Sequence, residues 1–316
     1  MNKNTKTSKL HELREKMETT DERIKNFEDV EFIYGTLIVK GHSIFIAAPP
    51  NGGKTTLLMK EIIPHLVKVQ KLSVNYIDMD ASQSQTKENH LWAKKIGFHY
   101  LSPLLSNSDG KEVLSFINDI LENEEDISDE IFIFDTAKQF YSVMEKGSAK
   151  QYGQICRRLT LRGATIINLC HTNKYPDEEG FFTFEGVGDI KNDCDELLNL
   201  HPKFDANKNL LKATIIVQKK RAFLEPMAFE FDASREVTIL EQTQLLEEIR
   251  NFNRDNSIIE AINFVLFSNQ LNESEIIDKL KVKFSRRKLK RVLEEYPEIW
   301  TVTRGLHNSK IYSIKL

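Results

Sequence analysis

Residues 43–56 read Ser-Ile-Phe-Ile-Ala-Ala-Pro-Pro-Asn-Gly-Gly-Lys-Thr-Thr, and this stretch decides the fold. Its first six residues form an apolar run typical of a buried strand, and a helix is predicted over residues 55–69. Residues 48–56 match the phosphate-binding pattern Gly-x-x-x-x-Gly-Lys-Ser/Thr except at its first glycine, which is Ala48 here. In such a strand–loop–helix turn, small residues let backbone N–H groups point at phosphate oxygens, and the helix N-terminus adds partial positive charge. The alternative is a chance match in an ordinary turn, but the context favours a P-loop that binds ATP and Mg²⁺.

Besides the glycines, three residues are expected to carry most of the nucleotide chemistry. Lys54 would reach the β- and γ-phosphates, and Thr55 would ligate Mg²⁺. Asp135 ends the apolar run Ile-Phe-Ile-Phe-Asp, which is the Walker B arrangement, and its carboxylate is expected to hold Mg²⁺ through water. The predicted nucleotide-binding residues are Pro50, Asn51, Gly52, Gly53, Lys54, Thr55 and Thr56.

ATP hydrolysis also needs a group that orients and polarises water. Thr136 directly follows Asp135, so this acid must come from elsewhere in the chain. Strand 74–80 ends in two acids and is expected beside the P-loop strand. Asp80 is our candidate for the catalytic acid and Asp78 is the second choice; the alternative is that both are turn residues.

From about residue 30 to 232, predicted strands and helices alternate. Beyond the P-loop strand, strands are expected over residues 72–79, 131–134, 165–170, 213–218 and 227–231. This alternation predicts an α/β fold, a P-loop NTPase core with a mainly parallel sheet covered on both faces. Before it, residues 8–28 carry an apolar heptad stripe that would pack either on its own domain or on a neighbouring subunit; its members are Leu10, Leu13, Met17, Thr20, Ile24 and Phe27.

A second compact unit is predicted at the C-terminus. Residues 257–267 form an apolar helix, Asn272 and Ser285 can cap two more helices, and Pro297 ends the last of them. Two strands follow over residues 300–304 and 310–314. Three helices and a hairpin in this order predict a small winged-helix domain. The predicted organisation is an N-terminal helical segment (1–29), an ATPase domain (30–240), a linker or short helix (241–256) and the winged helix (257–316).

Charge is unevenly distributed. The net charge is −3, yet residues 281–316 hold ten Lys/Arg and three Glu. A basic tail on an acidic body predicts that contact with nucleic acid uses this tail, although a winged helix can also serve protein contact. The candidate DNA-binding residues are Lys283, Arg286, Arg287, Lys290, Arg291, Arg304 and Lys310.

Several classes of protein are excluded by composition. With 40% hydrophobic residues the chain can bury a core, and with 29% charged residues it is neither fibrous nor disordered. No apolar run reaches the roughly 20 residues that a membrane helix needs, and no signal-peptide core is visible. The three cysteines are scattered without a Cys-x-x-Cys pair, which indicates idle thiols in a reducing cytoplasm.

Together these motifs resemble the RecA-like core of the DnaB/RepA class of ring ATPases, over about residues 30–232. The P-loop matches at Ala48–Thr56, Walker B matches at Asp135, and Asp80 matches the acid after the second strand, where the helicases usually have Glu. The resemblance implies that His171, at the end of a strand, contacts the γ-phosphate. It implies that residues 185–196 face the ring pore. Among Lys219, Lys220 and Arg221, it implies that Arg221, with Lys219 beside it, reaches the ATP of the adjacent subunit.

If the resemblance holds, this chain forms a homo-hexamer that hydrolyses ATP between subunits and binds single-stranded DNA in its pore, with duplex contacts at the winged helix. The leading hypothesis is a replicative DNA helicase of a plasmid, phage or mobile element. The alternative is a non-motor DNA-binding ATPase, such as a regulator, loader or recombination mediator. Asp at position 80 in place of Glu favours weaker hydrolysis and hence the alternative. A small-molecule kinase is disfavoured by the winged helix.

Overall fold

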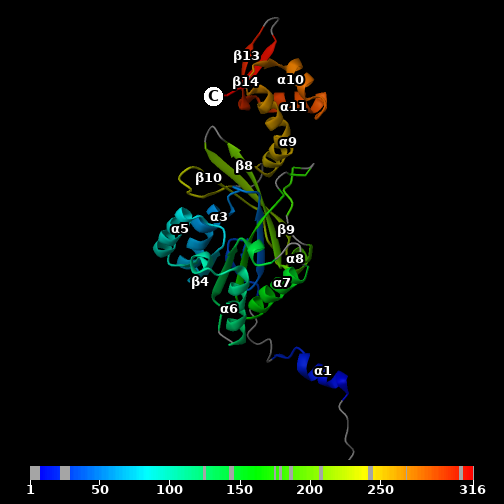
Figure 1. Ribbon diagram of the computed structural model, residues 1–316. Coiled ribbons are helices and arrows are strands. Elements are labelled where there is room, and N and C mark those ends of the chain that lie inside the picture. Colours follow the sequence, from blue (N-terminus) through cyan, green and yellow to red (C-terminus); the bar gives the residue numbers. More distant parts are fainter. Residues whose placement is uncertain are drawn as a thin grey trace, which may run out of the picture.

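A nine-stranded sheet forms the centre of the computed structural model (Figure 1). The structure describes residues 8–21, 29–123, 126–141, 146–173, 176–177, 180–184, 188–205, 209–240, 245–267, 269–305 and 309–315. The strand order is β11-β10-β9-β8-β3-β7-β6-β4-β5. The strands are β3 (Ser43–Ala48), β4 (Ser73–Asp78), β5 (His99–Leu101), β6 (Glu130–Asp135), β7 (Thr165–His171), β8 (Glu196–Asp205), β9 (Leu210–Lys219), β10 (Met227–Phe231) and β11 (Thr238–Leu240).

The predicted parallel sheet is confirmed for six of these strands. β5, β4, β6, β7, β3 and β8 pair in parallel, whereas β9, β10 and β11 extend the sheet with antiparallel pairs. One expectation about neighbours is wrong. β4 does not lie beside the P-loop strand β3, because β7 and β6 stand between them.

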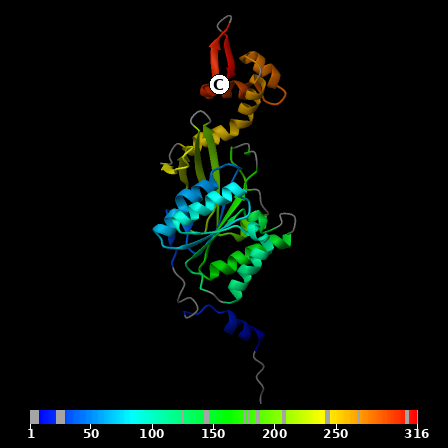
Figure 2. The same cartoon turned by 60° about the vertical axis from the view of Figure 1, so that its left-hand side comes forward.

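Alternation along β3 explains why both faces of the sheet are covered. Ile44 and Ile46 point into one apolar core, and Phe45 and Ala47 point into the other. The first core is closed by α3 (Lys54–Leu57), a π-helical turn (Leu58–Ile62), α4 (Ile63–Lys68) and α5 (Gln83–Ile96). The second is closed by α6 (Gly110–Glu122) and α7 (Lys146–Leu161), which Figure 2 shows on the other face of the sheet from α5. The short helix α8 (Gly188–Asp193) precedes β8.

A short helix lies in the described part of the N-terminal segment. α1 spans Lys9–Met17 and is capped by the Ser8 hydroxyl, so the predicted helix ends earlier than expected. Leu10, Leu13 and Met17 are each about half exposed or more. The rest of the predicted stripe, Ile24 and Phe27 included, lies outside the described residues. β1 (Phe32–Tyr34) and β2 (Ile38–Val39) then form a small antiparallel pair ahead of β3.

The C-terminal unit has its own apolar core and contains α9 (Leu245–Leu266), α10 (Glu273–Leu280), α11 (Arg286–Glu295) and strands β12 (Leu271–Asn272), β13 (Trp300–Arg304) and β14 (Lys310–Ile314). Both predicted caps are present, since Asn272 and Ser285 accept from backbone N–H groups of the helices they precede. Of the two alternatives for residues 241–256, a linker or a short helix, the structure has a helix from residue 245 onward, where α9 is continuous, and residues 241–244 lie outside the described part.

In the described part of the chain, no helix has the length and apolar character needed to cross a lipid bilayer.

Candidate functional site

The loop between β3 and α3 has the backbone geometry of a phosphate-binding loop. A Cβ on Gly52 would lie 2.8 Å from the Pro49 carbonyl oxygen, so only glycine fits at this point. Gly53 has a φ of +92° and is the residue that precedes α3. Ala48, which replaces the first glycine of the pattern, lies within β3 and is completely buried. The departure from the pattern therefore falls in the strand, outside the turn that needs glycine.

Among the predicted loop residues, one cannot act as expected. Pro50 has no backbone N–H, so it donates no hydrogen bond to a phosphate, and the amides must come from residue 51 onward. Lys54 is the first residue of α3 and is 8% exposed. Its ammonium group therefore sits at the helix N-terminus, where the helix dipole also favours an anion.

Thr55 and Asp135, the two predicted Mg²⁺ ligands, lie within contact of each other, although they follow strands β3 and β6 on opposite sides of β7. The Thr55 hydroxyl donates to Oδ2 of Asp135 over 3.5 Å. A hydroxyl and a carboxylate are oxygen ligands of the kind that Mg²⁺ prefers. The described residues contain no group of three or more His, Cys, Asp or Glu able to hold a metal ion. The Thr55 hydroxyl and the Asp135 carboxylate fit a Mg²⁺ ion whose other ligands are phosphate oxygens and water.

Tyr76 on β4 is a site residue that the sequence analysis missed. Its completely buried hydroxyl donates a short hydrogen bond to the same Asp135 oxygen that Thr55 faces. Burial raises the pKa of Asp135 to about 6, while the Tyr76 hydrogen bond and the Lys54 charge act in the opposite direction. The signal in the sequence was the alternation of Tyr76 and Asp78 on one face of a strand.

The two candidate acids after β4 lie in different environments. Asp78 is buried, and its carboxylate accepts from the backbone N–H groups of Asp80 and Ala81, both at 3.0 Å, and from the Tyr100 hydroxyl at 2.7 Å. With these hydrogen bonds, the Asp78 carboxylate holds the turn after β4 in place. Asp80 is exposed, and its charge is close enough to raise the pKa of Asp135. Of the two acids, Asp80 is the one whose carboxylate is open to a water molecule.

His171 ends β7 directly beside the P-loop strand. It pairs with Ala48 in the parallel register, and the next backbone N–H, of Thr172, donates to the Ala48 carbonyl over 3.1 Å. The chain then folds back on itself, with an antiparallel bridge between Thr172 and Phe184. Two β8 side chains hold the returning segment, because Asn199 donates to the Phe182 carbonyl and His201 accepts from its N–H. Residues 185–187, within the expected pore-facing segment, lie outside the described residues.

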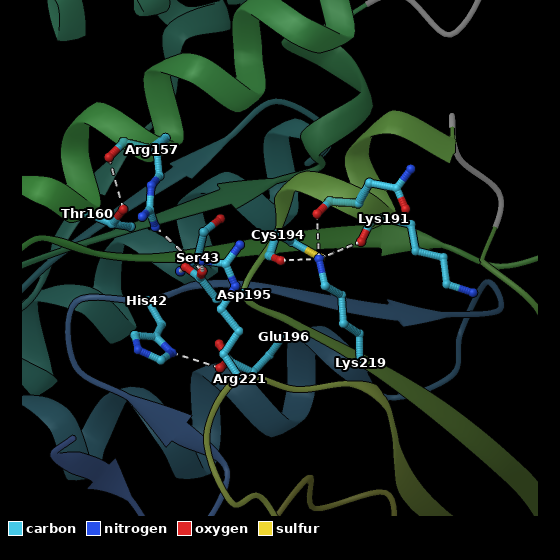
Figure 3. Close-up of polar contacts among 11 residues, drawn as sticks. His42, Ser43, Arg157, Thr160, Lys191, Cys194, Asp195, Glu196, Lys219 and Arg221 are labelled. Atoms are coloured by element: carbon cyan, nitrogen blue, oxygen red, sulfur yellow. Dashed lines mark hydrogen bonds and ion pairs between the residues drawn. The ribbon is translucent and has the colours of Figure 1, made fainter.

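Arg221 does not join this site within the chain. It lies at the other end of the sheet, where it forms a 2.8 Å ion pair with Asp195, just before β8 (Figure 3). Lys219, expected beside it as a second cation, is committed elsewhere. Its ammonium group donates to the carbonyls of Lys191, Asn192 and Cys194, at 2.9, 2.6 and 2.6 Å, and so caps the end of α8.

Two of the predicted DNA-binding residues have internal partners. Arg291 forms ion pairs with the buried Asp255 and with Glu295, so its guanidinium fastens α11 to α9. Lys290 pairs with Glu273 over 2.6 Å. Arg291 is therefore a structural residue, contrary to expectation, and Lys290 is partly engaged. The remaining five candidates are exposed: Lys283, Arg286, Arg287, Arg304 and Lys310.

Comparisons with known proteins add only distant likenesses. No protein-family model matches the sequence, and no curated protein matches it either. Among solved structures, the flagellar accessory protein FlaH from Methanocaldococcus jannaschii is 16% identical, with a TM-score of 0.44 over 65% of this chain and 92% of that one. The KaiC-like protein PH0186 from Pyrococcus horikoshii OT3 is 12% identical, with a TM-score of 0.46 over 65% of this chain and 91% of that one. Likenesses this weak assign no family and no activity, so the function must be argued from the site itself.

Proposed function

We propose that this protein hydrolyses ATP with Mg²⁺ at the carboxyl end of β3. The observation that carries the proposal is the meeting of Lys54, Thr55 and Asp135 around a loop whose glycines are required by its backbone. Lys54 binds the β- and γ-phosphates, and Thr55 and Asp135 hold the Mg²⁺ ion, which supplies charge neutralisation when bound. Asp80 orients the attacking water, and His171 contacts the γ-phosphate from the end of β7.

The position of Arg221 supports a shared active site. β3 has six residues, each rising about 3.3 Å, so its two ends lie about 17 Å apart. Arg221 is near the amino end of β3, through Asp195, while the P-loop is at the carboxyl end. Its guanidinium is therefore too far from the chain's own nucleotide to contact it, and we propose that it serves the nucleotide of a neighbouring copy in a homo-oligomeric ring, a hexamer, with ATP between subunits.

The C-terminal unit supports a DNA-binding role. Its three helices and antiparallel hairpin fit a winged helix, with α11 as the recognition helix. Lys283, Arg286 and Arg287 lie exposed at the start of α11, and Arg304 and Lys310 are exposed on the hairpin. We propose that these groups bind duplex phosphates and that the segment after His171 contacts single-stranded DNA in the ring, as in a helicase.

A second candidate is a DNA-binding ATPase that uses ATP to switch its assembly state without unwinding. The observation in its favour is Asp80 itself, since its side chain is one methylene shorter than the Glu of the helicases that the chain resembles. A shorter acid holds the water less closely to the γ-phosphate, which slows hydrolysis.

ATP hydrolysis by the purified protein, measured with and without single-stranded DNA, tests both candidates. Lys54→Ala and Arg221→Ala should each lose about a thousandfold in kcat, since a trans arginine contributes about that much or more. A mixture of the two variants should recover activity, because some interfaces then combine an intact P-loop with an intact Arg221. Lys212→Ala is the matched control. Lys212 lies on β9, at the end of the strand far from Lys219, so this variant should hydrolyse ATP at the wild-type rate.

The outcomes separate the models. Recovery in the mixture together with DNA stimulation supports a motor, and a strand-displacement assay should then show unwinding. Recovery without DNA stimulation supports the switch. Full activity of Arg221→Ala would contradict the shared site.

A further inference from the structure

We propose that a buried polar layer on β8 and β9 couples the nucleotide site to α9, and through α9 to the C-terminal unit. The layer consists of Asn199, His201, Thr214 and Asn253. This inference rests on the proposed contact between His171 and the γ-phosphate, because it names the side chains that carry the effect of that contact to another part of the molecule.

Three members of the layer lie together on one face of the sheet. Leu198 and Leu200 of β8 belong to the first apolar core, so Asn199 and His201, which alternate with them, face the opposite side. Thr214 of β9 stands directly opposite His201 in the antiparallel register and therefore shares its face. All three polar side chains are buried.

The first part of α9 covers this row. Ala228 of β10 pairs with Thr214, and Ile249 of α9 packs on Ala228. Asn253 lies one turn after Ile249 on the same face of the helix and is buried, so it faces the sheet as Ile249 does. Figure 1 shows α9 leaving the sheet beside β8. The fourth member of the layer therefore comes from the helix that leads to the C-terminal unit.

The segment that follows His171 covers the same two β8 residues. The Asn199 amide donates to the Phe182 carbonyl over 2.9 Å, and the Phe182 N–H donates to Nδ1 of His201 over 3.3 Å. Phe181 meets the His201 ring edge-on, with ring centroids 5.4 Å apart. A displacement of this segment therefore acts directly on His201.

The protonation state of His201 makes its second ring nitrogen a donor. Burial lowers the pKa of His201 to about 4, against the opposing effect of the Asp177 charge, so the ring is uncharged at neutral pH. Because Nδ1 accepts from Phe182, the proton is on Nε2. In the part of the chain that the structure describes, this buried Nε2 has no hydrogen-bond partner.

The other members of the layer supply what this donor needs. Oδ1 of Asn199, Oγ1 of Thr214 and Nδ2 of Asn253 are also buried without a hydrogen-bond partner among the described residues. Nε2 of His201 and Nδ2 of Asn253 are donors, Oδ1 of Asn199 is an acceptor, and the Thr214 hydroxyl is both. Buried polar groups strongly favour pairing in the low-dielectric interior. A small movement of α9 towards β8 and β9 that pairs these atoms is therefore favourable.

This complementarity gives α9 two positions. When His171 binds the γ-phosphate, it draws on the segment that follows, and Phe182 carries His201 with it. Nε2–H of His201 then donates to the Thr214 hydroxyl, that hydroxyl donates to Asn199, and Asn253 donates to Thr214. Loss of the γ-phosphate releases the segment and opens the layer. Because α9 continues into the C-terminal core, the unit there moves with it.

Amide hydrogen exchange of the whole protein tests the proposal, with Mg²⁺ and either a non-hydrolysable ATP analogue or ADP. The analogue should slow exchange over residues 249–256 about tenfold relative to ADP, because the paired layer adds buried hydrogen bonds that hold α9. Thr214→Val removes the central hydroxyl at nearly constant volume and should abolish this difference. Asn253→Leu should do the same. Both variants should keep the protection of the P-loop by either nucleotide.

Thr165→Val is the matched control, because Thr165 is another buried threonine of the sheet whose hydroxyl already has a partner. It accepts from the Gly41 N–H over 2.9 Å. Thr165→Val should therefore lower the free energy of unfolding in urea and keep the nucleotide effect on α9. Thr214→Val should show the reverse, since its hydroxyl has no partner among the described residues to lose.

The outcomes separate this proposal from the proposed function. Equal exchange of α9 with the analogue and with ADP in the wild type, although both nucleotides protect the P-loop, would overturn the coupling and leave the nucleotide site standing. A difference that survives in both Thr214→Val and Asn253→Leu would also overturn it, since α9 would then respond by another route. No protection of the P-loop by either nucleotide would contradict the proposed function itself, and this inference with it.

Discussion

At the scale of single residues, two hydroxyl groups converge on Oδ2 of Asp135, one from Thr55 after the P-loop glycines and one from Tyr76 on β4. The P-loop glycines and Lys54 occur within one turn, so their geometry follows from a strand and a helix only a few residues apart. Tyr76 was missed because its role depends on which strands are neighbours. Nothing in the chain between residues 76 and 135 shows that β4 pairs with β6, and only that pairing brings the Tyr76 hydroxyl to Asp135.

Tyr76→Phe should weaken the use of Mg²⁺ without unfolding the protein. The change removes the hydroxyl that orients the Asp135 carboxylate but keeps the ring that packs in the sheet core. A hydrogen bond to a charged group contributes about 1.5–3 kcal/mol, and about 1.4 kcal/mol corresponds to a tenfold change. We therefore expect kcat to fall about tenfold or more, with a rise in the Mg²⁺ concentration that gives half-maximal hydrolysis.

Tyr100→Phe is the control for this experiment. Tyr100 stacks on Tyr76 but donates to Asp78 instead of Asp135. It should disturb the turn after β4 and leave the Mg²⁺ dependence near that of the wild type. An unchanged Mg²⁺ requirement in Tyr76→Phe would show that the hydroxyl has no part in holding the carboxylate.

At the scale of elements, caps and strands were predicted where local chemistry dominates. Asn272 and Ser285 cap α10 and α11 as expected, and the C-terminal hairpin has the predicted bounds. β8 was not predicted, and of α9 only the second part was predicted as a helix without an alternative, because β8 and the first part of α9 carry polar residues that are buried in the fold. Asn199 and His201 on β8 hold Phe182, and Asp255 on α9 binds Arg291. Such partners are distant in sequence, so polarity alone suggested a loop and a linker.

Arg291→Ala should lower stability, whereas Arg287→Ala should leave stability nearly unchanged and weaken duplex binding, although both residues lie on α11. Arg291→Ala leaves the carboxylate of Asp255, which is 1% exposed, without its main partner, although the Tyr296 hydroxyl still donates to it and Arg254 remains 3.5 Å away. Breaking a buried pair costs about 3–5 kcal/mol, and we expect the lower part of this range because the Arg291 side chain is 31% exposed. Arg287 is exposed, so its loss should change stability by less than about 0.5 kcal/mol.

Urea unfolding and duplex binding at two salt concentrations check this pair of variants. Arg287→Ala should weaken duplex binding and lower the salt dependence, as expected when one phosphate contact is lost. Weak duplex binding by a fully stable Arg291→Ala protein would reverse the assignment and make Arg291 a DNA contact.

At the scale of the whole molecule, α9 joins two separate apolar cores. Near its start, Ile249 packs with Ala228 of β10, and Phe252 receives the Lys203 ammonium at 5.0 Å from its ring centroid. Its second half enters the C-terminal core with Ile258 and Ile262. Figure 1 shows this helix rising from the sheet to the C-terminal unit. The nine-stranded sheet and the proposed DNA-binding unit are therefore connected by a regular helix, and a movement of β8 or β9 would be transmitted along it.

The continuity of α9 can be tested by breaking it at an exposed position. Ser257 lies in the helix interior with its side chain exposed, between the two halves that pack on different cores. Ser257→Pro removes one backbone hydrogen bond and places the ring against the preceding turn, which costs about 3 kcal/mol or more. Local opening should then expose the bond after Arg254 to trypsin, and cleavage there should be much faster than in the wild type or in Ser257→Ala.

If duplex DNA alters ATP hydrolysis in the wild type, Ser257→Pro should lose that effect while keeping basal hydrolysis, because the P-loop and Asp135 are untouched. Rapid cleavage after Arg254 in the wild type and in Ser257→Ala would mean that this segment behaves as the flexible linker that its polar sequence suggested, and the two units would then act independently.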